Sequence, residues 1–397
     1  MSVDARMTNV MRASYGRLLA ILLTRSRDIL LAEDALSDAF AKALIHWPKE
    51  MPKNPEAWLL TVARNRLTDI ARRDNRIEFT DDVPEVREED KSQIDDFPDE
   101  RLKLMFVCAH PAIDARIHTP LMLQTVLGLE AETIAQAFLL PHATMAKRLV
   151  RAKRKIRDAA IAFQIPEQDE MAPRVSSVLE AIYGAFSRDW LGAGALAEEA
   201  LYLASLMVDL MPNDAEVLGL AALIAYTMSR ENARVQDGVF VPLDEQDASL
   251  WDRDLLHVAK GYLERAQAMN TVGRFQLEAA IQAVHADRFF TGVIDWRALV
   301  QLHLGLSRVA PTIGASVGYA AALGKAIGAQ DGLKALYAIE AKVRATFGPA
   351  EATRAYLLSE LGEFQEAALA YDRAISLTVE PPLREYLQTK RAELERK

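Results

Sequence analysis

The sequence predicts an all-α protein in which two small helical domains, joined by an acidic linker, are followed by a long C-terminal helical domain. Apolar residues recur at helical spacing through most of the 397 residues. Prolines and runs of charge divide the chain into segments. From residue 171 onward, no segment shows the alternating apolar and polar pattern of a β-strand. A chain of this length is expected to form two or three domains, at about 150 residues each.

The first domain is expected over residues 1–76. Its helical spacing is carried by Leu18, Leu19, Leu22 and Leu23, and further along by Ala35, Ala39, Phe40, Ala43 and Leu44. Prolines between His46 and Pro55 interrupt the pattern, because proline disrupts a helix interior. Helix resumes near Glu56 and is expected to end between Arg73 and Asn75.

Residues 77–100 form the expected acidic linker. Residues 76–100 carry 3 basic and 11 acidic side chains and little periodic apolar content, which is typical of a flexible segment. Such a strip is a solvated spacer, or it lies in a positively charged channel, or it masks the basic domains. The sequence leaves these alternatives open.

The second domain is expected over residues 101–164. The periodicity predicts helices over residues 102–109, 111–127, 131–138 and 143–162. A short helix, a turn at Leu139–His142 that contains Pro141, and a longer helix follow one another. This order is the layout of a helix-turn-helix, whose second helix enters the major groove of DNA.

The longer helix has one basic face and one apolar face when it is projected at about 100° per residue. The basic face holds Lys147, Arg148, Arg151, Arg154 and Lys155, the apolar face holds Met145, Leu149, Ala152 and Ile156, and Lys153 and Arg157 lie on the flanks. No acidic residue follows Glu132 until Asp158. Because Lys and Arg neutralise phosphates and bond guanine acceptors, the pattern favours DNA binding over a solvated basic face.

A second basic stretch lies in the first domain, at Arg64–Arg66 and Arg72–Arg73, with Asn65 inside it and Trp58 upstream. Arginine, asparagine and an aromatic ring together suit melted nucleic acid. Trp58 is alternatively a core residue, since it shares an apolar stripe with its neighbours.

An acidic patch lies on the preceding predicted helix, at Glu33, Asp34 and Asp38. Asp34 and Asp38 are four residues apart and therefore share a face. The patch is either a solvated face or a docking site for a basic partner helix.

Residues 171–397 are expected to form an α-solenoid or a compact bundle of short helix pairs, such as 196–210 with 214–229. The residues Gly362, Phe364, Ala367, Tyr371 and Ala374 have the spacing of a tetratricopeptide repeat, although an ordinary αα-hairpin has similar spacing. An atypical loop is expected over 232–251. The acids Asp244, Glu245, Asp247, Asp252 and Asp254 are either a cation site or ordinary solvated and helix-capping residues.

The net charge of −9 would by itself argue against a nucleic-acid binder, but the segments differ. The balance is +3 over residues 1–75, +6 over 101–164 and −10 over 165–397. We therefore expect the acidic C-terminal domain to contact the two basic domains and to control them.

A single cysteine and the absence of an apolar run of about 20 residues predict a cytoplasmic protein without a disulfide framework or a membrane span. Neither a phosphate-binding glycine loop nor a nucleophile motif occurs, so no enzyme activity and no cofactor are expected. Cys108 with His110, His118 and His142 matches no standard metal-finger spacing, and no metal site is predicted.

Taken together, the motifs resemble those of extracytoplasmic-function sigma factors. The segments Ala32–Phe40, Pro55–Asn65 and Arg72–Arg73 resemble region 2 of that family, whereas Glu132–Ala135 and Thr144–Arg157 resemble its region 4. Both lie in the family's order, within roughly residues 10–162.

The remainder of the chain resembles the extension of a subgroup with a tetratricopeptide-like C-terminal domain. The motifs Phe106–Pro111 and Asp244–Asp247, the latter followed by Trp251, are among those that carry the likeness. In that subgroup a second cysteine is expected where Ala109 stands here, and its absence weakens the idea of a redox or metal-binding cysteine pair.

The resemblance implies three sets of contacts. Glu33, Asp34 and Asp38 would dock a coiled coil of the β′ subunit of RNA polymerase core. Lys53, Asn54, Arg64, Asn65, Arg72 and Arg73 would contact the minus-ten element of promoter DNA. Thr144, Lys147, Arg148, Arg151, Arg154 and Lys155 would read the minus-thirty-five element. The linker would run through the polymerase, and the C-terminal domain would respond to an unknown protein or small-molecule signal.

The resulting hypothesis is a sigma factor that binds polymerase core and directs transcription initiation, with a regulatory C-terminal domain. The alternative is a helical-repeat scaffold protein that binds or titrates polymerase without initiating transcription. A promoter-dependent transcript in a reconstituted reaction distinguishes the two hypotheses.

Overall fold

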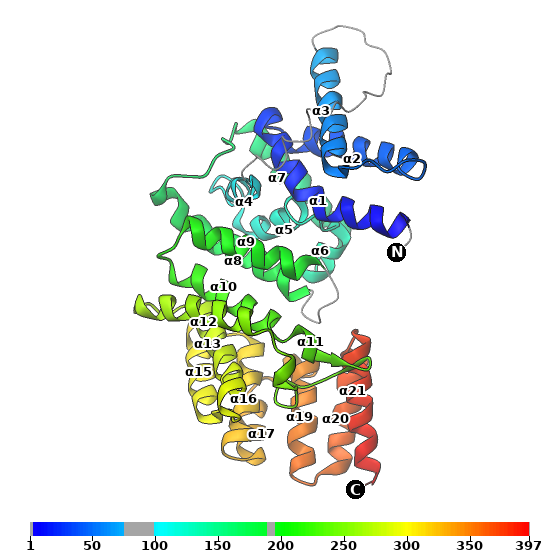
Figure 1. Ribbon diagram of the computed structural model, residues 1–397. Coiled ribbons are helices and arrows are strands. Elements are labelled where there is room, and N and C mark those ends of the chain that lie inside the picture. The colour runs from blue at the N-terminus through cyan, green and yellow to red at the C-terminus, as the bar shows by residue number, and fades with distance from the viewer. Residues whose placement is uncertain (1–2, 75–98, 189–194, 397) are drawn as a thin grey trace. The chain divides into compact units, whose positions relative to one another are not determined.

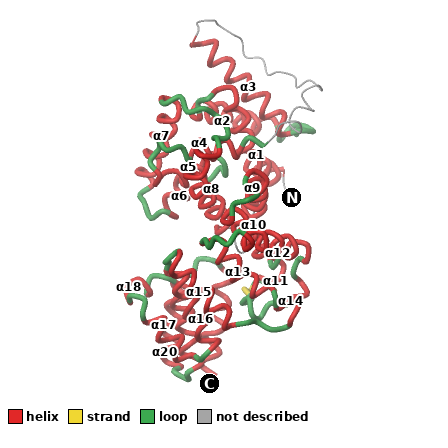
Figure 2. Tube along the Cα trace, turned by 90° about the vertical axis from the view of Figure 1, so that its left-hand side faces the viewer, coloured by secondary structure: helices red, strands yellow, loops and turns green. Residues whose placement is uncertain are grey.

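A computed structural model describes residues 3–74, 99–188 and 195–396 (Figure 1). The described chain is almost entirely helical, and in Figure 2 strands occur only at one short hairpin. The all-α prediction is therefore confirmed. The chain folds into two compact units, Met1–Arg188 and Asp189–Lys397.

The first unit begins with three mutually packed helices: α1 (Val3–Ser26), α2 (Ile29–His46) and α3 (Pro55–Asp74). Asp28 begins α2 by accepting the backbone N–H groups of Leu30 and Leu31. The leucines predicted on α1 and the alanines predicted on α2 are buried. Leu44 is an exception at 56% exposed, because it lies beside the buried face, which continues through Ala43 to Trp47. The interruption between α2 and α3 falls at the prolines, as predicted.

Five further helices complete the first unit: α4 (Arg101–Cys108), α5 (Ala115–Thr125), α6 (Ala131–Ala137), α7 (His142–Asp158) and α8 (Gln168–Arg188). Helix α5 begins later than the expected residue 111, because Asp114 caps it by accepting the N–H of Arg116. Helix α7 ends before the expected residue 162. The backbone of Ala160 is left-handed there, with φ 47°, which stops the helix.

Helix α8 packs against α4 and α5 as part of the same unit. His118 Nδ1 lies 3.2 Å from Ser177 Oγ, and Arg174 Nη1 donates to the Phe106 carbonyl at 3.5 Å. Val178 and Ile182 are fully buried. A helix that the sequence assigns to the C-terminal domain thus completes the core beside the predicted helix-turn-helix. The residue boundaries that the sequence predicts for the functional domains stay predictions.

The two halves of the first unit meet at Gly16 of α1. A Cβ atom at this glycine would lie 1.7 Å from the Val126 carbonyl oxygen, so the two backbones touch. Gly128, with φ +65°, turns the chain beside the ring of Tyr15. We call this contact between α1–α3 and α4–α8 the closed arrangement.

Gly16→Ala is expected to destabilise the closed arrangement by about 3 kcal/mol, because main chain must move to admit the methyl group. Gly184→Ala in α8 is the matched control, since its Cβ would meet only a Leu123 methyl group at 4.0 Å. That substitution should be neutral or stabilising by up to about 1 kcal/mol. Urea unfolding of the full chain measures both values. Equal stabilities would contradict the contact at Val126.

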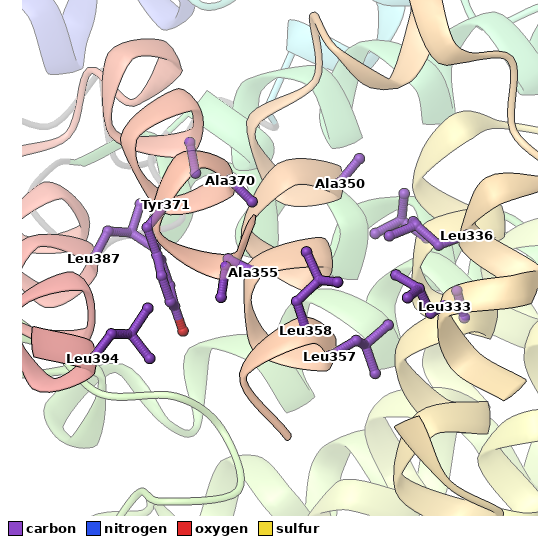
Figure 3. Packing of buried hydrophobic residues seen from close by; sticks show 14 residues of the cluster. Leu333, Leu336, Ala350, Ala355, Leu357, Leu358, Ala370, Tyr371, Leu387 and Leu394 are labelled. Carbon is purple, nitrogen blue, oxygen red and sulfur yellow. The ribbon is translucent and has the colours of Figure 1, made fainter. Parts of the chain in front are cut away.

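The second unit consists of helix pairs packed around apolar clusters. Its helices are α9 (Ala195–Leu210), α10 (Ala215–Met228), α11 (Glu231–Arg234), α12 (Arg253–Ala268), α13 (Arg274–Ala286), α14 (Arg288–Thr291), α15 (Trp296–Val309), α16 (Ile313–Ala326), α17 (Ala329–Tyr337), α18 (Ala341–Arg344), α19 (Gly348–Glu360), α20 (Phe364–Leu377) and α21 (Pro381–Glu393). Leu357 and Leu358 of α19 lie between Leu336 and Tyr371 in Figure 3.

The hairpin α19–α20 forms where the repeat-like spacing predicts it. Gly362, with φ +77°, makes the turn, and Ala367, Tyr371 and Ala374 are buried against α19 and α21. Its identity as a tetratricopeptide repeat stays a prediction.

The expectation of no strand after residue 171 is wrong at one place. Within the atypical loop, β1 (Val235–Gln236) pairs antiparallel with β2 (Val239–Phe240) around Gly238. A ladder of two residues per strand is too short to produce a recognisable alternation. Phe240 packs edge-on against Tyr386 of α21, with ring centroids 5.9 Å apart.

Candidate nucleic-acid interface

Helices α6 and α7 form the predicted helix-turn-helix. The Leu140 N–H bonds the Ala135 carbonyl at 2.9 Å, and the Met145 N–H bonds the Pro141 carbonyl at 3.1 Å. Between these bonds Leu139 is left-handed, with φ 52°, and 93% exposed. The turn is therefore tight, and α7 begins directly after it.

The two faces of α7 lie as the helical projection predicts. Its apolar face, Met145, Leu149, Ala152 and Ile156, is buried. The side chains of Lys147, Arg148, Arg151, Arg154 and Lys155 are exposed, and Thr144 at the start of the helix is half-buried. The structure thus brings the predicted minus-thirty-five residues onto one side of one helix.

Few acidic side chains of the protein offset the positive charge of this basic face. Within the described ranges, none of its five cations forms a salt bridge. The pKa of Asp114 is lowered chiefly by hydrogen bonds from Arg116, and to a smaller extent by the charge of Arg148. An exposed cationic face without salt bridges is suited to binding a polyanion.

Lys153 of α7 makes a contact that the sequence reasoning missed. Its Nζ lies 2.6 and 2.7 Å from the two carboxylate oxygens of Glu33 on α2, and the lysine side chain is only 5% exposed. Tyr15 also donates to Glu33, at 3.3 Å, and its pKa is raised by burial and by that carboxylate. Nearby, Arg157 lies 3.8 Å from Asp28. These ion pairs join α7 to α2 in the closed arrangement.

The three acids predicted to dock polymerase differ in their surroundings. Glu33 is engaged by Lys153, and Asp38 is bound by Arg66 of α3 at 3.0 Å. Asp34 is exposed. In the closed arrangement the acidic patch is therefore partly occupied by the protein's own cations.

The predicted minus-ten residues lie at the start of α3 and along it. Asn65 and Arg72 are exposed and Arg64 is half-exposed, while the side chain of Arg73 lies outside the described residues. Before the helix, Lys53 is exposed, and Asn54 caps α3 by accepting the Ala57 N–H at 3.0 Å. Asn54 thus has a structural role in addition to the predicted DNA contact.

The alternative interpretation of Trp58 as a core residue agrees with its packing. Trp58 is half-buried, and its ring lies edge-on to the buried ring of Trp47, with centroids 5.7 Å apart. The predicted linker falls mostly on residues 75–98, outside the described residues, so its proposed channel or masking role is not addressed.

The other polar candidates have ordinary structural roles. Burial raises the pKa of the Cys108 thiol to about 12, and Cys108 contacts the Thr125 hydroxyl at 3.5 Å. Asp247 and Asp252 cap helical turns, and Asp244 pairs with Lys325 at 2.9 Å. Among the described residues, no group of three histidine, cysteine or acidic side chains is placed to hold a metal ion.

Comparisons with known proteins agree with this architecture. Residues 10–77 match the family Sigma-70 region 2, and residues 174–267 match a family of unknown function, DUF6596. A protein of Rhizobium meliloti (strain 1021), described as Uncharacterized protein R00370, is 33% identical over 373 residues, which cover 90% of this chain and 88% of the relative. No solved structure matches the chain.

The chain therefore belongs to the sigma-70 family, a family of non-enzymatic transcription factors. Within it, the protein combines a sigma-70 region 2 at its N-terminus with a helical C-terminal extension that contains the DUF6596 segment. It binds RNA polymerase core and promoter DNA and acts in transcription initiation. No helix in the described part of the chain is long and apolar enough to cross a membrane.

Proposed function

We propose that α7 reads the minus-thirty-five element, that α3 and the residues before it contact the minus-ten element, and that α2 docks the β′ coiled coil. The observation that supports this assignment best is the exposed basic face of α7, which follows a tight turn and carries no acid before Asp158. A helix of this form fits the major groove, where Arg and Lys bond guanine.

The closed arrangement is then the resting form of the sigma domains. The two promoter elements are separated by about 25 base pairs, or about 85 Å of B-form DNA at about 3.4 Å per step. Helix α7 has 17 residues and is about 26 Å long, and in the closed arrangement it touches α2. Both elements are contacted together only after the two halves separate.

The linker can cover nearly all of this distance. The 24 residues 77–100 reach about 80 Å when fully extended. Opening breaks the contact of Lys153 with Glu33 and exposes that carboxylate to the polymerase. Polymerase binding and promoter binding thus favour the same open form.

The C-terminal domain regulates this activity in our proposal. The support is α8, most of which lies in the matched DUF6596 segment and whose Arg174, Val178 and Ile182 are buried against the helices beside the helix-turn-helix. Helix α8 is covalently continuous with the second unit and packs beside α4 and α5. A ligand or partner that binds the second unit could therefore act on the DNA-binding half through α8.

Reconstituted transcription with polymerase core tests both parts of the proposal. The full chain is expected to produce a promoter-dependent transcript, and a chain ending at Arg188 is expected to differ from it several-fold. A chain ending at Ala162 is not a suitable comparison, because it removes α8 and exposes the core that Val178 and Ile182 cover; we expect it to unfold or aggregate. Equal transcription by the full chain and the chain ending at Arg188 would refute regulation. Binding of core without any transcript would favour the scaffold alternative.

A further inference from the structure

The second unit buries a guanidinium group that lacks a carboxylate partner. Arg230 follows α10 and is only 4% exposed. Its Nη2 donates to the neutral amide oxygen of Gln282 at 2.6 Å. No described carboxylate lies within ion-pair distance of it. Burial, together with the charges of Arg234 and Arg288, lowers the pKa of Arg230 to about 9. A buried charge without compensation costs several kcal/mol.

A second cation and a buried indole lie beside Arg230. The guanidinium carbons of Arg230 and Arg288 lie 6.0 and 5.2 Å from the centre of the Trp251 ring, which is 3% exposed. Arg288 of α14 donates to the backbone carbonyls of Asp244 and Gln246, and these two hydrogen bonds hold its side chain against the atypical loop. The carboxylate of Asp244 is paired with Lys325 at 2.9 Å, and the pKa of Asp247 is lowered chiefly by hydrogen bonds from Ser249 and to a smaller extent by the charge of Arg288.

Three nitrogen atoms in this region are buried without a hydrogen-bond partner among the described residues: Arg230 Nη1, Trp251 Nε1 and His285 Nδ1. His285 is close enough to Arg230 that the arginine charge acts with burial to lower the histidine pKa to about 4. The amide oxygen of Gln246 is also unpaired. Leaving each such group without a hydrogen bond destabilises the folded state.

We propose that Arg230, Trp251 and His285, with Arg288 beside them, form a buried site for a small oxyanion, a phosphate or a carboxylate. Oxyanion oxygens accept hydrogen bonds from N–H groups of this kind and would supply the missing negative charge. A guanidinium group can bond two such oxygens at once. A water molecule can accept a hydrogen bond from it but cannot supply the negative charge. A hydrogen phosphate would in addition donate to Gln246 Oε1. This proposal concerns the second unit alone and does not depend on promoter recognition.

Titration calorimetry of the full chain tests the proposal. The chain, dialysed into chloride buffer, is titrated with inorganic phosphate and, separately, with malonate, at constant ionic strength. We expect one saturable site for at least one anion. The midpoint temperature of thermal unfolding of the second unit should rise by roughly 5–10 °C when the anion concentration is a hundredfold above the dissociation constant. Binding of phosphate alone identifies the phosphate class, and binding of malonate alone identifies the carboxylate class. The absence of saturable binding by either anion would overturn the proposal.

Two variants locate the binding. Arg230→Gln removes the buried charge and should abolish saturable binding and the thermal shift. Arg297→Gln, an exposed arginine of α15, is the matched control and should behave as the unmodified chain. If Arg230→Gln fails to fold, Trp251→Phe removes a single donor and should weaken binding about fivefold. Equal affinity in all variants would place any anion elsewhere and would also overturn the proposal.

Discussion

Lys147→Glu with Arg148→Glu should reduce binding to the minus-thirty-five element by at least about thirtyfold and abolish promoter-dependent transcription. Both side chains are exposed on the basic face of α7. Each lost base or phosphate contact removes about 1–3 kcal/mol, and each new carboxylate adds repulsion from the DNA phosphates. Electrophoretic mobility shift with the holoenzyme, together with run-off transcription, measures the two effects.

Arg297→Glu with Arg308→Glu on α15 is the control for this prediction. It makes the same change of charge at two exposed positions of the second unit. If the proposed recognition is correct, this variant retains most of its binding and transcription. Undiminished transcription by the α7 variant would show that another part of the chain reads the upstream element. An equal loss in both variants would attribute the effect to net charge.

The faces of α7 could be predicted from the sequence because they follow from the helical repeat alone. Met145 and Leu149 are buried and Arg148 and Arg151 are exposed, as the projection requires. Lys153 could not be assigned in this way, because it lies at the border between the two faces. Its burial depends on Glu33, 120 residues earlier in the chain, and no local pattern contains that contact.

The same distinction applies to the second unit. The pair α19–α20 could be predicted, since small residues at Ala367 and Ala374 mark a close helix contact. The buried state of Arg230 could not be predicted, because arginine usually indicates a surface position. Burial there depends on Trp251, in the loop before α12, and on Gln282 of α13, which lie beside Arg230 only in the folded chain.

The acidic patch illustrates a limit of assigning roles by motif. By sequence, Glu33, Asp34 and Asp38 form one set. In the folded chain Glu33 bonds Lys153 of α7, Asp38 bonds Arg66 and Asp34 is exposed. A single patch therefore has two functions in our proposal: it docks polymerase in the open form and holds α7 in the closed arrangement. Variants that separate these functions are the sharpest test of the closed arrangement.

Lys153→Met should tighten binding of polymerase core by at least about tenfold. In the closed arrangement it leaves the Glu33 carboxylate, 17% exposed, without its cation, which costs roughly 3 kcal/mol. In the open form that carboxylate is solvated, so the equilibrium shifts toward opening by up to about a hundredfold. Competition binding to core measures the affinity, and small-angle scattering should show a larger radius of gyration.

Two further variants separate opening from docking. Lys155→Met makes the same substitution at an exposed position of α7 and should change neither core affinity nor radius. Glu33→Gln breaks the same buried contact but also removes a docking carboxylate, so it should open the chain while binding core more weakly than Lys153→Met does. If Lys153→Met leaves both the radius and the core affinity unchanged, the contact with Glu33 does not restrain the sigma domains. If Glu33→Gln binds core as tightly as Lys153→Met, Glu33 restrains the closed arrangement without docking polymerase.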